Sequence, residues 1–117
     1  MSYSRRSTIN YENNPDADCT IEASLSILGG KWKLKIYKIL RSGQPLRFKT
    51  IKEQLDPISD KTLTAQLREM EEDNLIIRQV FPVIPPKVEY QLTDLGKSLE
   101  EIFLALEKWG KTYINQR

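Results

Sequence analysis

Histidine is absent from this sequence of 117 residues, and cysteine occurs only once, at Cys19. Without histidine the chain cannot form a Ser-His or Cys-His nucleophile pair, a histidine general base or most zinc sites. A single cysteine excludes a disulfide within the chain and fits the reducing cytoplasm, where we expect the protein to be. We therefore predict no enzymatic activity, no catalytic residues, no metal and no cofactor.

Long apolar runs are also missing. No stretch reaches the roughly 18 apolar residues of a membrane-spanning helix, and residues 1–18 lack the apolar segment of a secretory signal. We expect residues 1–18 to form a flexible polar tail and residues 19–117 to form one domain. Hydrophobic residues make up 39% of the sequence, which is enough for one buried core in a chain of this length.

Charge is distributed unevenly, although the net charge is only +2. Residues 31–52 contain eight lysines and arginines and no acid, whereas residues 53–73 contain seven acids and two basic residues. Such a basic stretch favours contact with a polyanion such as nucleic acid. A solvated helix face would show the same pattern, so both interpretations stay open at this point.

Apolar residues recur at helical spacing through most of the chain. The stripe formed by Ile21, Leu25 and Leu28 predicts a first helix that begins near Thr20. Residues 31–41 alternate at first as a strand does, but their lysines and a later helical stripe favour a second helix.

Two more helices are predicted on either side of a proline turn. Residues 48–55 have helical spacing, and Pro57 disfavours helix at the residue before it. Ser59 is a strong N-cap for the next helix, which we predict over residues 59–73. A tight turn followed by a well-capped helix is typical of the helix-turn-helix motif, although a plain helical hairpin would show the same stripes.

A β-hairpin and a long helix complete the predicted architecture. Residues 76–81 are rich in β-branched and aromatic side chains, and residues 87–92 alternate between apolar and polar. A helix pair followed by such a hairpin predicts a winged helix-turn-helix fold, mainly α with a small β-hairpin (α+β). Thr93 then caps a final helix of about 20 residues with a heptad-like apolar seam.

This seam predicts a homodimer. A domain this small cannot cover so much apolar surface, so we expect the last helix to pack against a second copy. Packing within the core of one chain is the alternative. The predicted interface residues on this helix are Leu99, Ile102, Leu106 and Trp109.

Several short motifs follow one another along the chain. They are CTIEA at 19–23, GGKWK at 29–33, RF at 47–48, ISDKTLTAQLREM at 58–70 and PPKVEYQLT at 85–93. In order and spacing they closely resemble the HxlR-type winged helix-turn-helix regulators of bacteria, in the MarR-like superfamily, over residues 19 to about 110. The resemblance implies a dimeric DNA-binding transcriptional regulator that dimerises through its first and last helices, which adds Ile21 and Leu25 to the predicted interface. Its helix at 59–73 would lie in the major groove, and its hairpin at 76–92 would be the wing.

The outward face of the helix at 59–73 is small, polar and basic, which suits base edges and phosphates. The basic residues before this helix are expected to contact phosphates, and a plain solvated face is the alternative. Arg78 is expected to pair with an acid inside the protein. The predicted DNA-binding residues are Ser59, Lys61, Thr62, Thr64, Ala65 and Arg68 on the helix, Arg47, Lys49 and Lys52 before it, and Lys87 in the wing.

Two positions depart from the family pattern. Asp60 stands where relatives often carry glutamine, and Asn74 stands where a glycine is usual. Because an acid near the groove repels phosphates, the first departure can alter the preferred DNA site.

Cys19 is a candidate redox sensor. In some relatives of this family a cysteine just before the first helix senses quinones, aldehydes or oxidants, and Cys19 falls there. A helix start favours a reactive thiolate, while the nearby acids oppose it. An electrophile or another small molecule would then be the inducer. The alternative is that Cys19 is only a small apolar side chain that packs at the start of the helix.

These observations predict a homodimer that binds an inverted repeat in double-stranded DNA and has no membrane partner. The alternative is a winged-helix adaptor that binds proteins and not DNA. The acid-free stretch at 31–52 argues against the adaptor.

Overall fold

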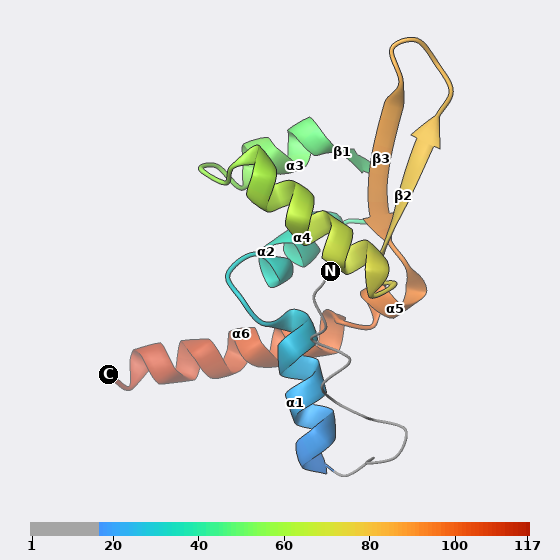
Figure 1. The fold of residues 1–117 in the computed structure, drawn as a ribbon. Helices are drawn as coiled ribbons and strands as arrows, with labels where there is room; N and C mark the ends of the chain where they lie inside the picture. The colour runs from blue at the N-terminus through green and yellow to red at the C-terminus, as the bar shows by residue number, and fades with distance from the viewer. Residues whose placement is uncertain (1–16) are drawn as a thin grey trace.

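The computed structural model describes residues 17–117, with side chains from Thr20 onward. The tail expected at residues 1–18 lies outside the described residues, apart from the two backbone positions with which α1 begins. In chain order the elements are α1 (Ala17–Leu28), α2 (Lys33–Leu40), β1 (Leu46–Arg47), α3 (Phe48–Gln54), α4 (Asp60–Glu72), β2 (Ile76–Phe81), β3 (Lys87–Leu92), α5 (Asp94–Lys97) and α6 (Glu100–Asn115) (Figure 1).

The hydrophobic core lies where α2, α3 and α4 meet the sheet. Each of these helices buries the apolar stripe that its sequence predicts, so the helical interpretation of residues 31–41 is confirmed. The most deeply buried side chains are Ile36, Tyr37 and Leu40 of α2, Ile51 of α3, Leu63, Leu67 and Met70 of α4, and Ile76 of β2.

A small antiparallel sheet, with strand order β1-β3-β2, closes one side of the core. Leu46 of β1 pairs with Tyr90, and the β2–β3 hairpin runs in register from Ile76 opposite Leu92 to Phe81 opposite Lys87. The hairpin extends beyond the core as the predicted wing, while α1 and α6 project from the other end of the molecule (Figure 1).

Both ends of α4 follow the sequence prediction. The Ser59 hydroxyl accepts a hydrogen bond from the Thr62 backbone N–H at 3.0 Å, which caps the first turn. At the other end Asn74 adopts a left-handed conformation with φ of 61°, which asparagine tolerates better than most residues. The substitution of asparagine for the usual glycine therefore preserves the turn into β2.

Two predicted helix boundaries are wrong. The first helix begins at Ala17 and not near Thr20, so Thr20 lies inside α1 and does not cap it. The long final helix is in fact two helices, because Thr93 caps only the four-residue α5 and a turn at Ser98 and Leu99 precedes α6.

The break between α5 and α6 follows from how α5 is attached. The Thr93 hydroxyl donates to the Asn74 carbonyl at 2.6 Å and accepts from the Gly96 N–H at 2.9 Å. Gly96 lies so close to the Leu75 carbonyl that a Cβ there would be 2.1 Å from its oxygen. These contacts hold α5 against the turn after α4, and the chain then turns so that Leu99 enters the core at 6% exposure.

Glu100 attaches the start of α6 to α2. Its carboxylate accepts hydrogen bonds from the Tyr37 hydroxyl and from Arg41, whose Nε lies 3.0 Å away. The hydrogen bonds from Arg41 and then Tyr37 hold the pKa of Glu100 below its ordinary value of 4.5. The Phe103 ring packs against Tyr37 with centroids 5.3 Å apart. Beyond Phe103, α6 leaves the core. Among residues 17–117, no helix is both long and apolar enough to cross a membrane.

The contact between Gly96 and Leu75 can be tested by adding a methyl group. We expect Gly96→Ala to lower the free energy of unfolding by about 2–3 kcal/mol, because the new Cβ meets a backbone oxygen that cannot move alone. Gly110→Ala in α6 is the matched control, since nothing lies within 4 Å of its added Cβ, and helix propensity predicts a gain of up to about 1 kcal/mol. Thermal and urea unfolding measure both changes; equal stability of the two variants would contradict the contact.

Candidate nucleic-acid interface

Helix α4 presents a polar face to solvent because its other face is fixed in the core. Leu63, Leu67 and Met70 are 0–2% exposed, which sets the rotation of the helix about its axis. The residues predicted to contact DNA lie away from these three. Ser59, Lys61, Thr64, Ala65 and Arg68 are exposed, and Thr62 is half-buried beside the Ser59 hydroxyl.

An ion pair fastens α4 to α2. The Lys33 ammonium donates to a Glu69 carboxylate oxygen at 2.5 Å, and the Lys33 side chain is only 5% exposed. Removing the Glu69 carboxylate would leave the buried Lys33 ammonium without this partner, so the pair holds the two helices in one arrangement. The sequence does not reveal this role, because Lys33 has the same local pattern as the other lysines of the basic stretch.

Only part of the basic stretch at residues 31–52 is available to a ligand. Lys33 and Arg41 form ion pairs within the chain, and the ammonium groups of Lys31 and Lys35 lie 4.8 and 5.1 Å from the centre of the Trp32 ring. The stretch therefore differs along its length: Lys33 and Arg41 are ion-paired within the fold, whereas Arg47 and Lys49 are exposed.

The second half of the stretch lies at and within α3. Arg47 and Lys49 are exposed, whereas Lys52 is half-buried and its ammonium lies 3.5 Å from a carboxylate oxygen of Asp60. Asp60 is also the acid in the first turn of α4, where the helix dipole favours a negative charge. The acid that departs from the family pattern is therefore paired with a lysine of α3, which reduces its repulsion of an approaching phosphate.

The wing carries little charge. Lys87 lies at the start of β3, where its ammonium is 3.5 Å from a Glu89 oxygen and 4.6 Å from the centre of the Phe81 ring. No charged residue occurs between Arg78 and Lys87, and at the tip Val83 is 52% and Ile84 101% exposed.

Arg78 does not lie where the sequence predicted. It is exposed, and within residues 20–117 no acid forms an ion pair with it, so the expected pairing inside the protein is wrong. In the hairpin Arg78 is directly opposite Tyr90, which places both side chains on the face turned towards α4. Side chains two residues apart in a strand lie on the same face, so the buried Ile76 could have indicated that Arg78 lies on the face turned towards α4.

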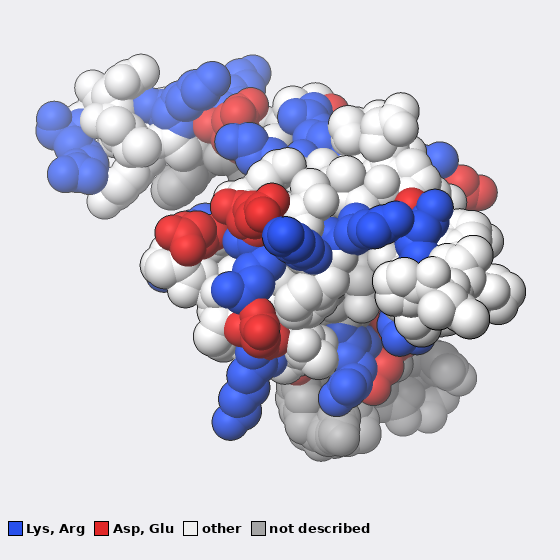
Figure 2. All heavy atoms as spheres, turned by 90° about the horizontal axis from the view of Figure 1, so that it is seen from above, with Lys and Arg blue, Asp and Glu red and all other residues white. Residues whose placement is uncertain are grey.

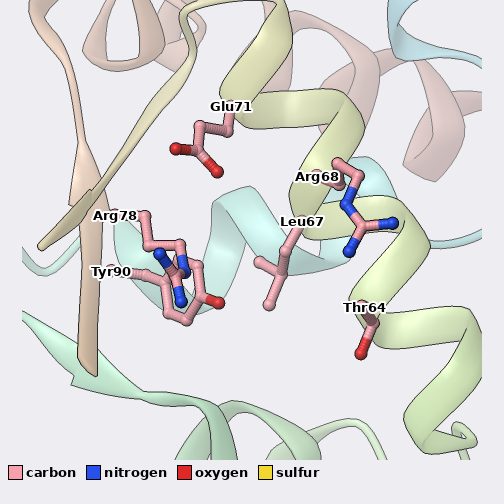
Figure 3. Close-up of a pocket in the computed structure, with 6 residues that line it drawn as sticks. All are labelled: Thr64, Leu67, Arg68, Glu71, Arg78 and Tyr90. Atoms are coloured by element: carbon pink, nitrogen blue, oxygen red, sulfur yellow. The ribbon is translucent and has the colours of Figure 1, made fainter. Parts of the chain in front are cut away.

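Arg78 and α4 border a cleft with a volume of about 390 Å³. Figure 3 shows Arg78 and Tyr90 on the hairpin side and the side chains of α4 on the other. We call it the α4–wing cleft; its lining residues are Thr64, Leu67, Arg68, Glu71, Arg78 and Tyr90.

Basic side chains from four elements, β1, α3, α4 and β2, share one end of the molecule. Figure 2, viewed from the end that bears α3 and the wing, shows several lysines and arginines spread over this surface with acids among them. We define the α3–α4–wing face by Arg47 and Lys49 near the start of α3, Lys61 and Arg68 of α4, and Arg78 of β2.

A different surface, on α1 and α6, is apolar and exposed. Ile21 and Leu25 of α1 are 58% and 66% exposed, and Ile102, Leu106 and Trp109 of α6 are 40–66% exposed. Leu99 differs from the others, because the turn before α6 places it in the core of its own chain. We call the five exposed residues the α1–α6 apolar face; it lies at the end of the molecule away from the wing (Figure 1).

Cys19 falls within α1, but its side chain lies outside the described residues.

The sequence matches the family model of the HxlR-like helix-turn-helix over residues 27–117. The HTH-type transcriptional regulator BH0655 of Halalkalibacterium halodurans is 48% identical over 87 residues, which is 74% of this chain and 77% of the relative.

Solved structures show the same fold. The structure of the HTH-type transcriptional regulator YtcD superposes with a TM-score of 0.76 at 44% identity, covering 81% of this chain and 96% of that one. The reduced form of the transcriptional regulator YodB from Bacillus subtilis superposes with a TM-score of 0.73 at 36% identity, covering 80% and 91%. Quinone-bound and diamide-treated forms of YodB match as well.

Proposed function

Because this chain belongs to the HxlR-like helix-turn-helix family of DNA-binding transcriptional regulators, we propose that it reads an inverted-repeat operator as a homodimer. Its relatives are regulators and not enzymes. The observation that carries the proposal is the exposed face of α4: it is polar, it carries Lys61 and Arg68, and it has the wing beside it. None of the relatives favours the protein-binding adaptor.

In this proposal α4 enters the major groove with its N-terminal half first. The Arg68 guanidinium can donate two hydrogen bonds to a guanine, and the Ala65 and Thr64 methyl groups can contact a thymine methyl. Glu71 and Glu72 lie at the C-terminal end, where their charge weakens the attraction of that end for phosphates. The order of charges along α4 therefore fixes which end approaches the bases.

The phosphates beside the groove are held by the neighbouring elements. Arg47 and Lys49 are exposed and have no ion-pair partner in the described part of the chain, so they meet phosphates at little cost. Lys52 and Lys87 form ion pairs with Asp60 and Glu89, which reduces their attraction for a phosphate. We expect Lys49 to contribute more to affinity than Lys52.

The partner of the α1–α6 apolar face is a second copy of the chain. The Trp109 and Tyr113 rings stack with centroids 5.5 Å apart and remain more than half exposed, which leaves a large aromatic surface uncovered in the single chain. A two-fold pairing would cover this surface on both copies and place two α4 helices on one side of the duplex. Half-sites about 10 bp apart, or a multiple, would follow.

Base and phosphate contacts predict different behaviour in mutants. Genomic footprinting first identifies the bound sites, and a titration against one such site then compares variants. Arg68→Ala is expected to cost about 1–3 kcal/mol and to relax preference at one position in each half-site, because a bidentate base contact is lost. Lys49→Ala is expected to weaken all sequences alike and to flatten the salt dependence. Lys97→Ala on α5 is the control. If neither substitution on the interface changes binding, the assignment of α4 to the groove is wrong.

The dimer is tested at Trp109. Because this side chain is 66% exposed in the single chain, Trp109→Asp is expected to leave the fold intact and to prevent dimerisation by burying an unpaired charge. Sedimentation should then show a monomer, and DNA affinity should fall with it, while Trp109→Phe retains most of the dimer. A wild-type chain that sediments as a monomer at micromolar concentration would contradict the proposed assembly.

Cys19 remains the proposed sensor, supported by the forms in which YodB has been solved. With no second cysteine in the chain, diamide can give only a disulfide to another molecule, and a quinone can give only an adduct. We expect either reagent to reduce operator binding by wild type and to leave Cys19→Ser unaffected. Mass spectrometry confirms modification at the thiol; a modified wild type that still binds as before would exclude this switch.

A further inference from the structure

The α4–wing cleft contains hydrogen-bond donors that the fold does not use. Neither Arg68 nor Arg78 forms an ion pair with any residue between 20 and 117. Figure 3 shows the hydroxyl groups of Thr64 and Tyr90 turned towards the same space, from α4 and β3 respectively. Leu67, which is 2% exposed, forms the apolar floor between the two sides.

This set of groups selects the chemistry of the ligand. Two guanidinium groups and two hydroxyls offer many donors, and a tetrahedral anion with several acceptor oxygens meets donors from both sides at once. A neutral or cationic ligand would leave both arginines unpaired. We propose that the α4–wing cleft binds a phosphate group of the DNA backbone, which accepts hydrogen bonds from Arg78 of the wing, while Arg68 on the other side adds its positive charge and keeps its paired donors for the guanine.

The DNA backbone is a better source of this phosphate than a free anion. The cleft opens between the two elements assigned to DNA, and its arginines are exposed, so a free anion would compete with water and salt for them. A duplex that is already bound through α4 presents its phosphates at a fixed place. The inference thus rests on the proposed DNA binding and adds Arg78, which sequence analysis assigned to the protein interior.

Glu71 gives the cleft a second property. It is exposed, lines the same cleft and projects from α4 into the space between helix and hairpin (Figure 3). Its charge opposes the phosphate that the arginines attract. Affinity for the backbone is therefore held below what two arginines alone would give, and Glu71→Gln is expected to strengthen binding.

The test uses an arbitrary-sequence 24-bp duplex with a fluorescent label, because backbone contacts do not depend on sequence. Arg78→Ala is expected to weaken binding several-fold. It is also expected to reduce the steepness of the plot of log K against log salt concentration by about 1 for each Arg78 that contacts a phosphate. Arg78→Lys keeps the slope and loses part of the affinity. Arg117→Ala, at the far end of α6, removes the same charge and is expected to change neither, and circular dichroism confirms that each variant is folded.

The remaining outcomes separate the two proposals and the two phosphate sources. If wild type and Arg78→Ala bind the duplex with the same salt slope, Arg78 holds no phosphate and the proposed phosphate site is wrong, while the proposed DNA binding stands. A wild type that binds neither this duplex nor its footprinted sites overturns the proposed function itself. Inorganic phosphate is the second probe: if millimolar phosphate raises the melting temperature of wild type but not of Arg78→Ala, and duplex binding is equal, the ligand is a free anion and the backbone assignment is wrong.

Discussion

The close contact between Gly96 and the Leu75 carbonyl is the constraint on which the arrangement of the molecule depends. It joins the turn that ends α4 to the short helix that follows the wing, so both sides of the DNA-facing surface meet at one point. Thr93 reinforces it through the Asn74 carbonyl and by capping α5. Beyond α5 the chain makes a tight turn at Ser98 and Leu99, and α6 then runs away from the wing (Figure 1). The apolar face of α6 is thereby left uncovered in the single chain.

Charge in this protein has two roles that composition alone does not separate. Lys33 and Lys49 belong to the same basic stretch, yet one is buried in an ion pair with Glu69 and the other is exposed beside the proposed groove. The acids are divided in the same way: Glu100 accepts from Tyr37 and Arg41 within the fold, while Glu71 faces the α4–wing cleft. Only the three-dimensional positions show which charges a polyanion can reach.

The sequence predicts what depends on local patterns. Helical stripes, the Ser59 cap and the strand alternation at residues 87–92 are set by neighbours in the chain, and the structure confirms them. What the sequence missed depends on contacts between distant residues. The break before α6 needs the approach of Gly96 to Leu75, and the exposure of Arg78 depends on how far the hairpin stands from α4; neither distance is encoded in local spacing.

Helix α2 connects the two functional surfaces through one row of side chains. Lys33 and Tyr37 of α2 and the C-cap Arg41 follow one another at intervals of four residues, so they lie along one side of a helix that is only two turns long. The first binds Glu69 of α4, and the other two bind Glu100 of α6. In the proposed dimer, α6 fixes the partner and α4 reads the DNA, so the distance between the two reading helices is set through this row. A ligand that turned α6 relative to α2 would have to carry α4 with it or break a hydrogen-bonded charge pair, and either change would alter the spacing presented to the operator.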